Sequence, residues 1–115
     1  MTGGVYLVGD PERGPKKIGI SANYQARLTH IRHYAPFKVW LLNTWDMPQD
    51  AAYAVEQTAH AMLWDCLAHG EWFHTDIAEA WRTVDLAEQL VDGRCWQQFR
   101  FEERMPPFDG SEWRA

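Results

Sequence analysis

Six cations and no carboxylate occupy the stretch from Arg13 to Trp45, in a chain whose formal net charge is −5. The six are Arg13, Lys16, Lys17, Arg27, Arg32 and Lys38, and the same stretch contains His30 and His33. A guanidinium can hold two oxygens of one phosphate, and a lysine adds a point charge. This clustering favours one face that attracts an anion, although a solvated surface is the plainer alternative. The acidic total argues against a generic nucleic-acid binder.

Glu56 is one of few charges in residues 49–67, where apolar residues recur at helical spacing. A single carboxylate suits Mg²⁺ or Mn²⁺, because such ions complete their shells with water and substrate oxygens. His60 lies one turn later on the same helical face. Three roles stay open for it: bonding to Glu56, contact with phosphate, or packing. Zinc bound by Glu56, His60, His69 and His74 matches no standard spacing.

Two short strands are expected to position the first candidates. Residues 4–8 and 17–21 are rich in strand-forming side chains, and a turn-rich segment joins them. Antiparallel pairing would place Tyr6 and Lys17 on one side of a sheet, whereas Lys16 would point to the opposite face, toward DNA or solvent. Ser21 can cap the following helix, the favoured role, or contact phosphate.

The rest of the chain reads as helices around a third strand. A helix carries Arg27 and ends before Pro36, and residues 37–45 form the third strand. The helix of residues 49–67 and another that follows Asp76 come next, separated by a short irregular element. The order β-β-α-β-α-α predicts an α+β fold, with a small three-stranded antiparallel sheet flanked by helices.

The length of 115 residues predicts one domain. We place it at residues 1–94, followed by an aromatic extension at residues 95–115 that forms an extra strand or an association tail. Cys66 and Cys95 stand singly, so reduced thiols are expected and a disulfide framework is not. No signal peptide and no membrane-length apolar run is seen, so a cytoplasmic location is expected.

Residues 4–6 (GVY) and residues 17–19 (KIG), ten residues apart, resemble the paired motifs of the GIY-YIG nuclease superfamily. Arg27 falls on the next helix, where that family keeps an arginine. Glu56 falls on a later helix, where it keeps a metal-binding glutamate. The resemblance covers about residues 3–90, and the ordered set is more specific than either tripeptide.

Other residues are similar to a compact phage and microbial branch of that superfamily. Lys17 replaces the second tyrosine, His60 follows Glu56 by one turn, and residues 70–73 read GEWF. We expect Glu71 and Trp72 in that segment to close the wall of the site or to fix the edge of the sheet, and we treat the Trp72-Phe73 pair as a structural anchor. Many nucleases of the family carry a polar residue one helical turn after the arginine, and this chain has Ile31 at that position.

The resemblance implies a metal-dependent endonuclease that hydrolyses phosphodiester bonds. Tyr6, its hydroxyl pKa lowered by a nearby lysine and metal ion, would orient or activate water, while Lys17 and Arg27 hold the phosphate. Glu56 would bind Mg²⁺ or Mn²⁺, and His60 joins the catalytic set. DNA is the expected substrate, with RNA left open. The residues expected to contact nucleic acid around the site are Lys16, Ser21, His30, Arg32, His33 and Lys38.

Two other functions compete with cleavage. A non-cleaving protein on the nuclease scaffold could bind or inhibit a nucleic-acid-handling complex, with the acidic C-terminal half meeting a protein partner. A small-molecule-binding domain ranks lowest. A target with two-fold symmetry would require a homodimer, for which the aromatic extension is the best candidate interface.

Overall fold

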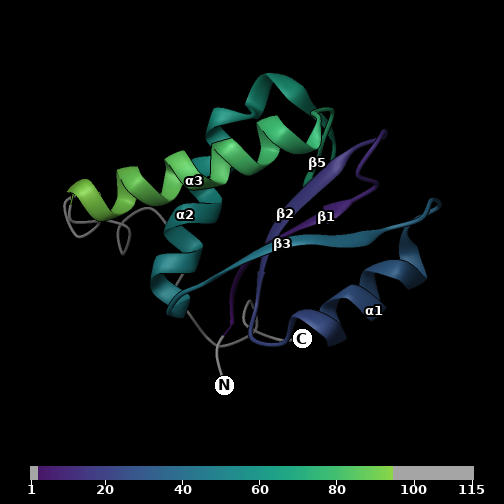
Figure 1. Cartoon of the computed structure of the whole chain (residues 1–115), viewed down its shortest axis with the longest axis horizontal. Coiled ribbons are helices and arrows are strands. Elements are labelled where there is room, and N and C mark those ends of the chain that lie inside the picture. Colours follow the sequence, from purple (N-terminus) through teal and green to yellow (C-terminus); the bar gives the residue numbers. More distant parts are fainter. Residues whose placement is uncertain (1–2, 95–115) are drawn as a thin grey trace.

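The computed structural model describes residues 3–94, which form a sheet with helices on both faces (Figure 1). The elements in chain order are β1 (Gly4–Gly9), β2 (Lys16–Ser21), α1 (Tyr24–Tyr34), β3 (Trp40–Asp46), α2 (Gln49–Met62), the 3₁₀ helix η1 (Trp64–Cys66), β4 (Leu67–His69), β5 (Trp72–Phe73) and α3 (Ile77–Arg94). The predicted α+β class, with an antiparallel sheet flanked by helices, is confirmed.

The sheet has five strands instead of the expected three, in the order β3-β1-β2-β5-β4, and its strand pairs are antiparallel. The two additional strands come from the segment expected to be irregular. Gly70 turns the chain between them with φ +61°, a conformation that glycine adopts without steric cost. Strands of three and two residues are too short to show the alternation by which a strand is recognised in sequence.

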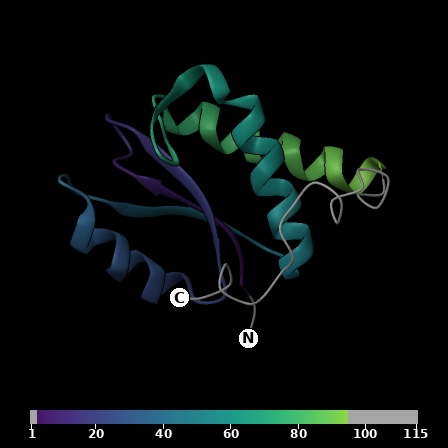
Figure 2. The same ribbon diagram turned by 180° about the vertical axis from the view of Figure 1, so that it is seen from behind.

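Alternation along β1 divides the interior into two cores. Val5 and Leu7 belong to the core that packs against α2 and α3. Tyr6 and Val8 belong to the smaller core beneath α1. The views from the front and from behind both show α1 across the sheet from α2 and α3 (Figures 1 and 2). Tyr6 therefore points from the sheet toward α1. Lys17 points to the same side, because it is the register partner of Val8, and paired residues of neighbouring strands share a face.

Strand β2 runs on past its short neighbour. Only Lys16 and Lys17 pair with β5, so the edge of β2 beyond Lys17 has no β5 partner. The N-terminus of α1 follows directly, with Asn23 as N-cap: its side chain accepts from the Ala26 amide at 3.1 Å. This open edge is where elements from both faces of the sheet meet.

Several boundaries differ from the sequence predictions. Strand β3 starts at Trp40, not at residue 37, and α2 ends at Met62, because a 3₁₀ turn follows it. The aromatic extension, its expected strand at residues 96–101 and Cys95 lie outside the described residues. Among residues 3–94, no helix is both long and apolar enough to cross a membrane.

Candidate active site

Three of the predicted catalytic residues line one polar hollow of about 260 Å³ at the open edge of β2. Tyr6 comes from β1, Arg27 from α1 and Glu56 from α2. Residues from three elements, up to 50 positions apart in the chain, thus reach one space from both faces of the sheet. The further lining residues are Gly19, Ile20, Tyr53, Gln57 and Glu71.

The Tyr6 ring lies against the backbone of Gly19. A Cβ atom at that glycine would stand 2.4 Å from the Tyr6 hydroxyl oxygen and 2.5 Å from the ring carbon that bears it. Glycine is therefore required there for steric reasons, at the last residue of the KIG motif. Arg27 donates a side-chain hydrogen bond to the Tyr6 hydroxyl, which fixes the ring from the α1 side.

The protein surroundings raise the pKa of the Tyr6 hydroxyl, and the lowering expected from a nearby metal ion stays a prediction. Tyr6 is 2% exposed, and burial is the largest cause of the rise. The charge of Arg27 acts in the opposite direction, and the carboxylates of Glu71 and Glu56 add to the rise. A buried hydroxyl that accepts a hydrogen bond from Arg27 is suited to orienting water by hydrogen bonds.

Glu56 presents a buried carboxylate to the hollow. It is 7% exposed, and its Oε1 accepts a hydrogen bond from the Gln57 side chain at 3.1 Å. Glu71 lines the same space, so two carboxylates share it with the Arg27 guanidinium. Oxygen donors in a polar hollow with room for water fit the needs of Mg²⁺ or Mn²⁺. Within residues 3–94, no group of three or more His, Cys, Asp or Glu side chains is arranged to hold a metal ion.

Lys17 forms an ion pair with Glu71, the residue after the Gly70 turn. The side chain of Lys17 is 14% exposed and that of Glu71 is 52% exposed. Glu71 therefore lies in the wall of the hollow, one of the two roles expected for it, and its carboxylate also pairs with Lys17. Lys17 lies on the predicted side of the sheet, and its role toward phosphate stays a prediction.

His60 is not among the residues that line the hollow. Its Nε2 lies 2.8 Å from the Ile18 carbonyl oxygen and must donate to it, and its ring lies 5.1 Å from that of Phe73. Of the three roles left open, packing is the one observed. The hydrogen bond satisfies a β2 carbonyl just beyond the β5 pairing, so His60 supports the open edge on which the site is built.

Stability is expected to fall in mild acid because of His60. Burial lowers the pKa of its imidazole below the ordinary 6.5, against the raising effect of the bond to Ile18. The unfolded chain then binds a proton first, so the contribution of His60 is complete above about pH 6.5 and decreases as the pH falls through the lowered folded-state pKa. Melting temperatures from about pH 5 to pH 8 should show a flatter profile for His60→Gln than for the wild type. An unchanged profile in His60→Gln, matching an exposed His74→Gln control, would contradict this.

Lys16 is buried, so the prediction that it faces DNA or solvent is wrong. It is 1% exposed, and its Nζ donates to the carbonyl oxygens of Gly14 at 2.8 Å and Arg13 at 3.5 Å. Burial lowers the pKa of its ammonium group, and the carboxylates of Asp10 and Asp76 oppose that change. Lys16 closes the turn between β1 and β2.

Replacing Lys16 by alanine is expected to cost about 1–3 kcal/mol of unfolding free energy, through lost packing and unpaired carbonyls. Urea denaturation measures this. The exposed Lys38→Ala should remain within about 0.5 kcal/mol of the wild type. Equal losses in the two variants would mean that the turn does not depend on Lys16.

The other residues expected to contact nucleic acid are divided by exposure. Ser21 is fully buried and exchanges hydrogen bonds of 3.0 Å with the backbone of Asn23, so it supports the helix cap and is not a surface contact. His30, Arg32, His33 and Lys38 are exposed. Their contact with nucleic acid stays a prediction.

Two residues of α2 that line the hollow were not predicted from the sequence. Tyr53 and Gln57 lie three positions before and one position after Glu56, and Tyr53 is 9% exposed. Positions 53, 56 and 57 share a helical face, which was the available signal. Apolar spacing along the helix does not indicate this face, because Glu56 and Gln57 on it are polar.

The fold and this hollow define a small α+β domain of nuclease-like type. A protein-family comparison matches residues 3–88 to the T5orf172 domain. The chain belongs to this family, a phage-associated domain of the GIY-YIG nuclease-like type. No curated protein and no solved structure matches the chain significantly.

Proposed function

We propose that the protein is a metal-dependent endonuclease that hydrolyses phosphodiester bonds of nucleic acid. The observation that carries this proposal is the convergence of Tyr6, Arg27 and Glu56, from three different elements, on one polar hollow. Family membership is consistent with it.

Each side chain has a distinct task in hydrolysis. Arg27 would hold the oxygens of the scissile phosphate, where its positive charge opposes the charge that develops during attack. Tyr6, whose hydroxyl accepts from Arg27, would place the attacking water by a hydrogen bond. The water adds OH to phosphorus, the bond to the leaving oxygen breaks, and that oxygen ends as a hydroxyl.

The carboxylate of Glu56 would hold Mg²⁺ or Mn²⁺, with Glu71 as a second oxygen donor within the hollow. Such an ion, when bound, neutralises phosphate charge and lowers the pKa of coordinated water. Lys17 pairs with Glu71 in the protein alone, so phosphate entry would compete with this ion pair for the lysine.

Cleavage of a supercoiled plasmid and of labelled single-stranded DNA and RNA tests the proposal. Reactions with Mg²⁺, with Mn²⁺ and with EDTA should show strand breaks only with the metals. Absence of breaks in all three substrates under all metal conditions would reject it.

One observation favours a non-cleaving role as the second candidate. Glu71 pairs with Lys17, so that lysine is engaged by a carboxylate and the Arg27 guanidinium shares the hollow with the Glu56 carboxylate. Affinity for nucleic acid without any cleavage would support this reading.

A further inference from the structure

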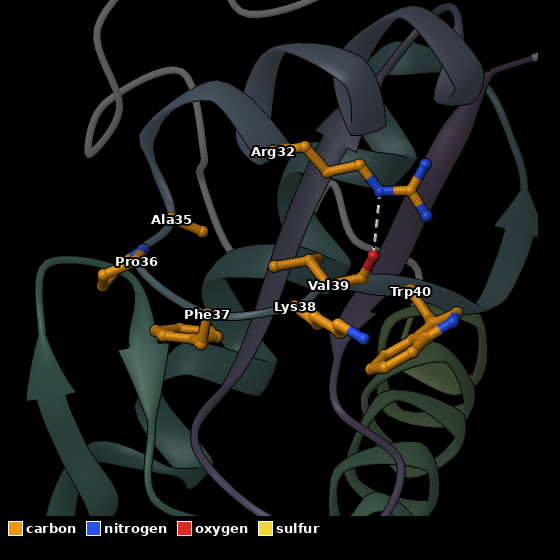
Figure 3. A pocket seen from close by; sticks show the side chains of 7 residues that line it. All are labelled: Arg32, Ala35, Pro36, Phe37, Lys38, Val39 and Trp40. Atoms are coloured by element: carbon orange, nitrogen blue, oxygen red, sulfur yellow. Dashed lines mark hydrogen bonds between the residues drawn. The ribbon is translucent and has the colours of Figure 1, made fainter.

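A path of connected hollows leads from the active site along residues 34–40. The first hollow, of about 590 Å³, shares Arg27 with the active-site hollow and is also lined by Lys17, His30, Tyr34, Phe37 and Trp72. The second, of about 540 Å³, shares Phe37 with the first and continues past Lys38 to Trp40 (Figure 3).

Aromatic rings along this path are open to solvent. Tyr34 is 75% exposed, Phe37 38% and Trp40 42%. Two of these rings have edge contacts with neighbours: Tyr34 with His30 at 4.9 Å and Phe37 with Trp72 at 5.1 Å. Rings held in this way are preorganised flat surfaces, and exposing them costs the protein hydrophobic free energy.

Positive side chains alternate with the rings. Figure 3 shows Lys38 between Phe37 and Trp40, with Arg32 above them on α1. The Nε of Arg32 donates to the Val39 carbonyl at 2.9 Å, which holds the guanidinium beside the path. No Asp or Glu occurs between residues 13 and 45, so the segment that forms most of the wall has no carboxylate.

The path ends where acidic residues enter its wall. The next hollow shares Phe37, Lys38 and Trp40 with the second but is lined on its other side by Asp10 and Glu12. The part of the path without carboxylates therefore extends from the first of these hollows to Trp40.

We propose that this path, the aromatic track, binds an unpaired nucleic-acid strand next to the cleavage site. Bases stack on Tyr34, Phe37 and Trp40, and phosphates lie beside Arg32 and Lys38. Exposed rings between cations are the arrangement that holds single strands, because every unpaired base offers a flat face. Bases within a duplex are already stacked on one another and offer no such face. The inference rests on the proposed function for the identity of the polymer, and it adds that the bound segment is single-stranded.

Binding is measured without cleavage, in EDTA, by fluorescence anisotropy with a labelled oligothymidylate of about 12 nucleotides and with a duplex of equal length. The single strand should bind more tightly than the duplex. Phe37→Leu and Trp40→Leu keep apolar bulk and remove the ring, and each should weaken single-strand binding by about tenfold. Trp64→Leu is the matched control, because Trp64 is 68% exposed and lines none of these hollows.

Salt dependence separates stacking from charge. Lys38→Ala should reduce the slope of log affinity against log salt by about 0.7, the value for one phosphate contact on a single strand. The two leucine variants should keep the wild-type slope. Phe37→Trp, which restores an aromatic face, should bind as the wild type does, and circular dichroism confirms that each variant is folded.

The results distinguish this inference from the proposed function. Tighter duplex binding, or leucine variants that bind like Trp64→Leu, would overturn the aromatic track even if plasmid DNA is cut. Single-strand binding that depends on Phe37 and Trp40 would support the track even if no cleavage occurs, and the cleavage proposal would then fail alone.

Discussion

Replacing Glu56 by glutamine is expected to reduce metal-dependent strand cleavage by about 10³-fold. The substitution preserves side-chain shape and removes one negative charge from a site that is 7% exposed. A neutral amide is a poor ligand for Mg²⁺ compared with a carboxylate, so the hollow would lose its principal metal donor. Gel analysis of plasmid nicking under single-turnover conditions gives the rate.

A matched control is available on the neighbouring helix. Glu88 is also partly buried, lies on α3 and lines none of the described hollows, so Glu88→Gln should cut at the wild-type rate. Thermal unfolding should show that both variants are folded. Undiminished nicking by a folded Glu56→Gln protein would remove Glu56 from the proposed mechanism.

Gly19→Ala is expected to lower cleavage by about 10²-fold and the unfolding free energy by about 1–3 kcal/mol. The new methyl group would stand 2.4 Å from the Tyr6 hydroxyl oxygen, so the ring has to move. Movement of the ring breaks its hydrogen bond with Arg27 and displaces the hydroxyl that orients water. The same substitution thus tests packing and catalysis together.

A double-mutant cycle separates the two effects. In Gly19→Ala combined with Tyr6→Leu, the atoms that clash are gone, so Gly19→Ala should cost less stability in the Tyr6→Leu background than in the wild type. Cleavage should not recover, because the hydroxyl is absent. Urea denaturation and single-turnover nicking provide the two readouts. Strictly additive stability losses would show that the glycine does not serve to accommodate Tyr6.

The local order of the chain was readable from its residues. Strand β1 has valine on both faces and β2 has isoleucine on one face, α1 ends before Pro36, and turn residues separate the first two strands. These signals act over a few residues, so the α+β class and the element order follow from them. The site residues Tyr6, Arg27 and Glu56 were named by motif resemblance, and their roles stay predictions.

Tertiary structure decided what surrounds those residues. The alternation of side chains along a strand does not predict exposure next to a turn. Lys16 was therefore predicted to be a surface cation, although it is buried. The pKa of Tyr6 depends on burial beneath α1, which no local pattern encodes. The Lys17–Glu71 ion pair joins residues 54 positions apart through a hairpin of very short strands.

The sequence alone therefore indicated the longer elements and the candidate site residues, because propensity, capping and turn residues act locally. Only the tertiary structure decided that β2 runs past β5 and leaves an open edge. At that edge α1 and α2 bring Arg27 and Glu56 to Tyr6. His60 does not line the hollow, and its imidazole hydrogen-bonds the backbone carbonyl of Ile18. The physical reason is that pairing between distant segments, and the burial it creates, depends on the whole fold.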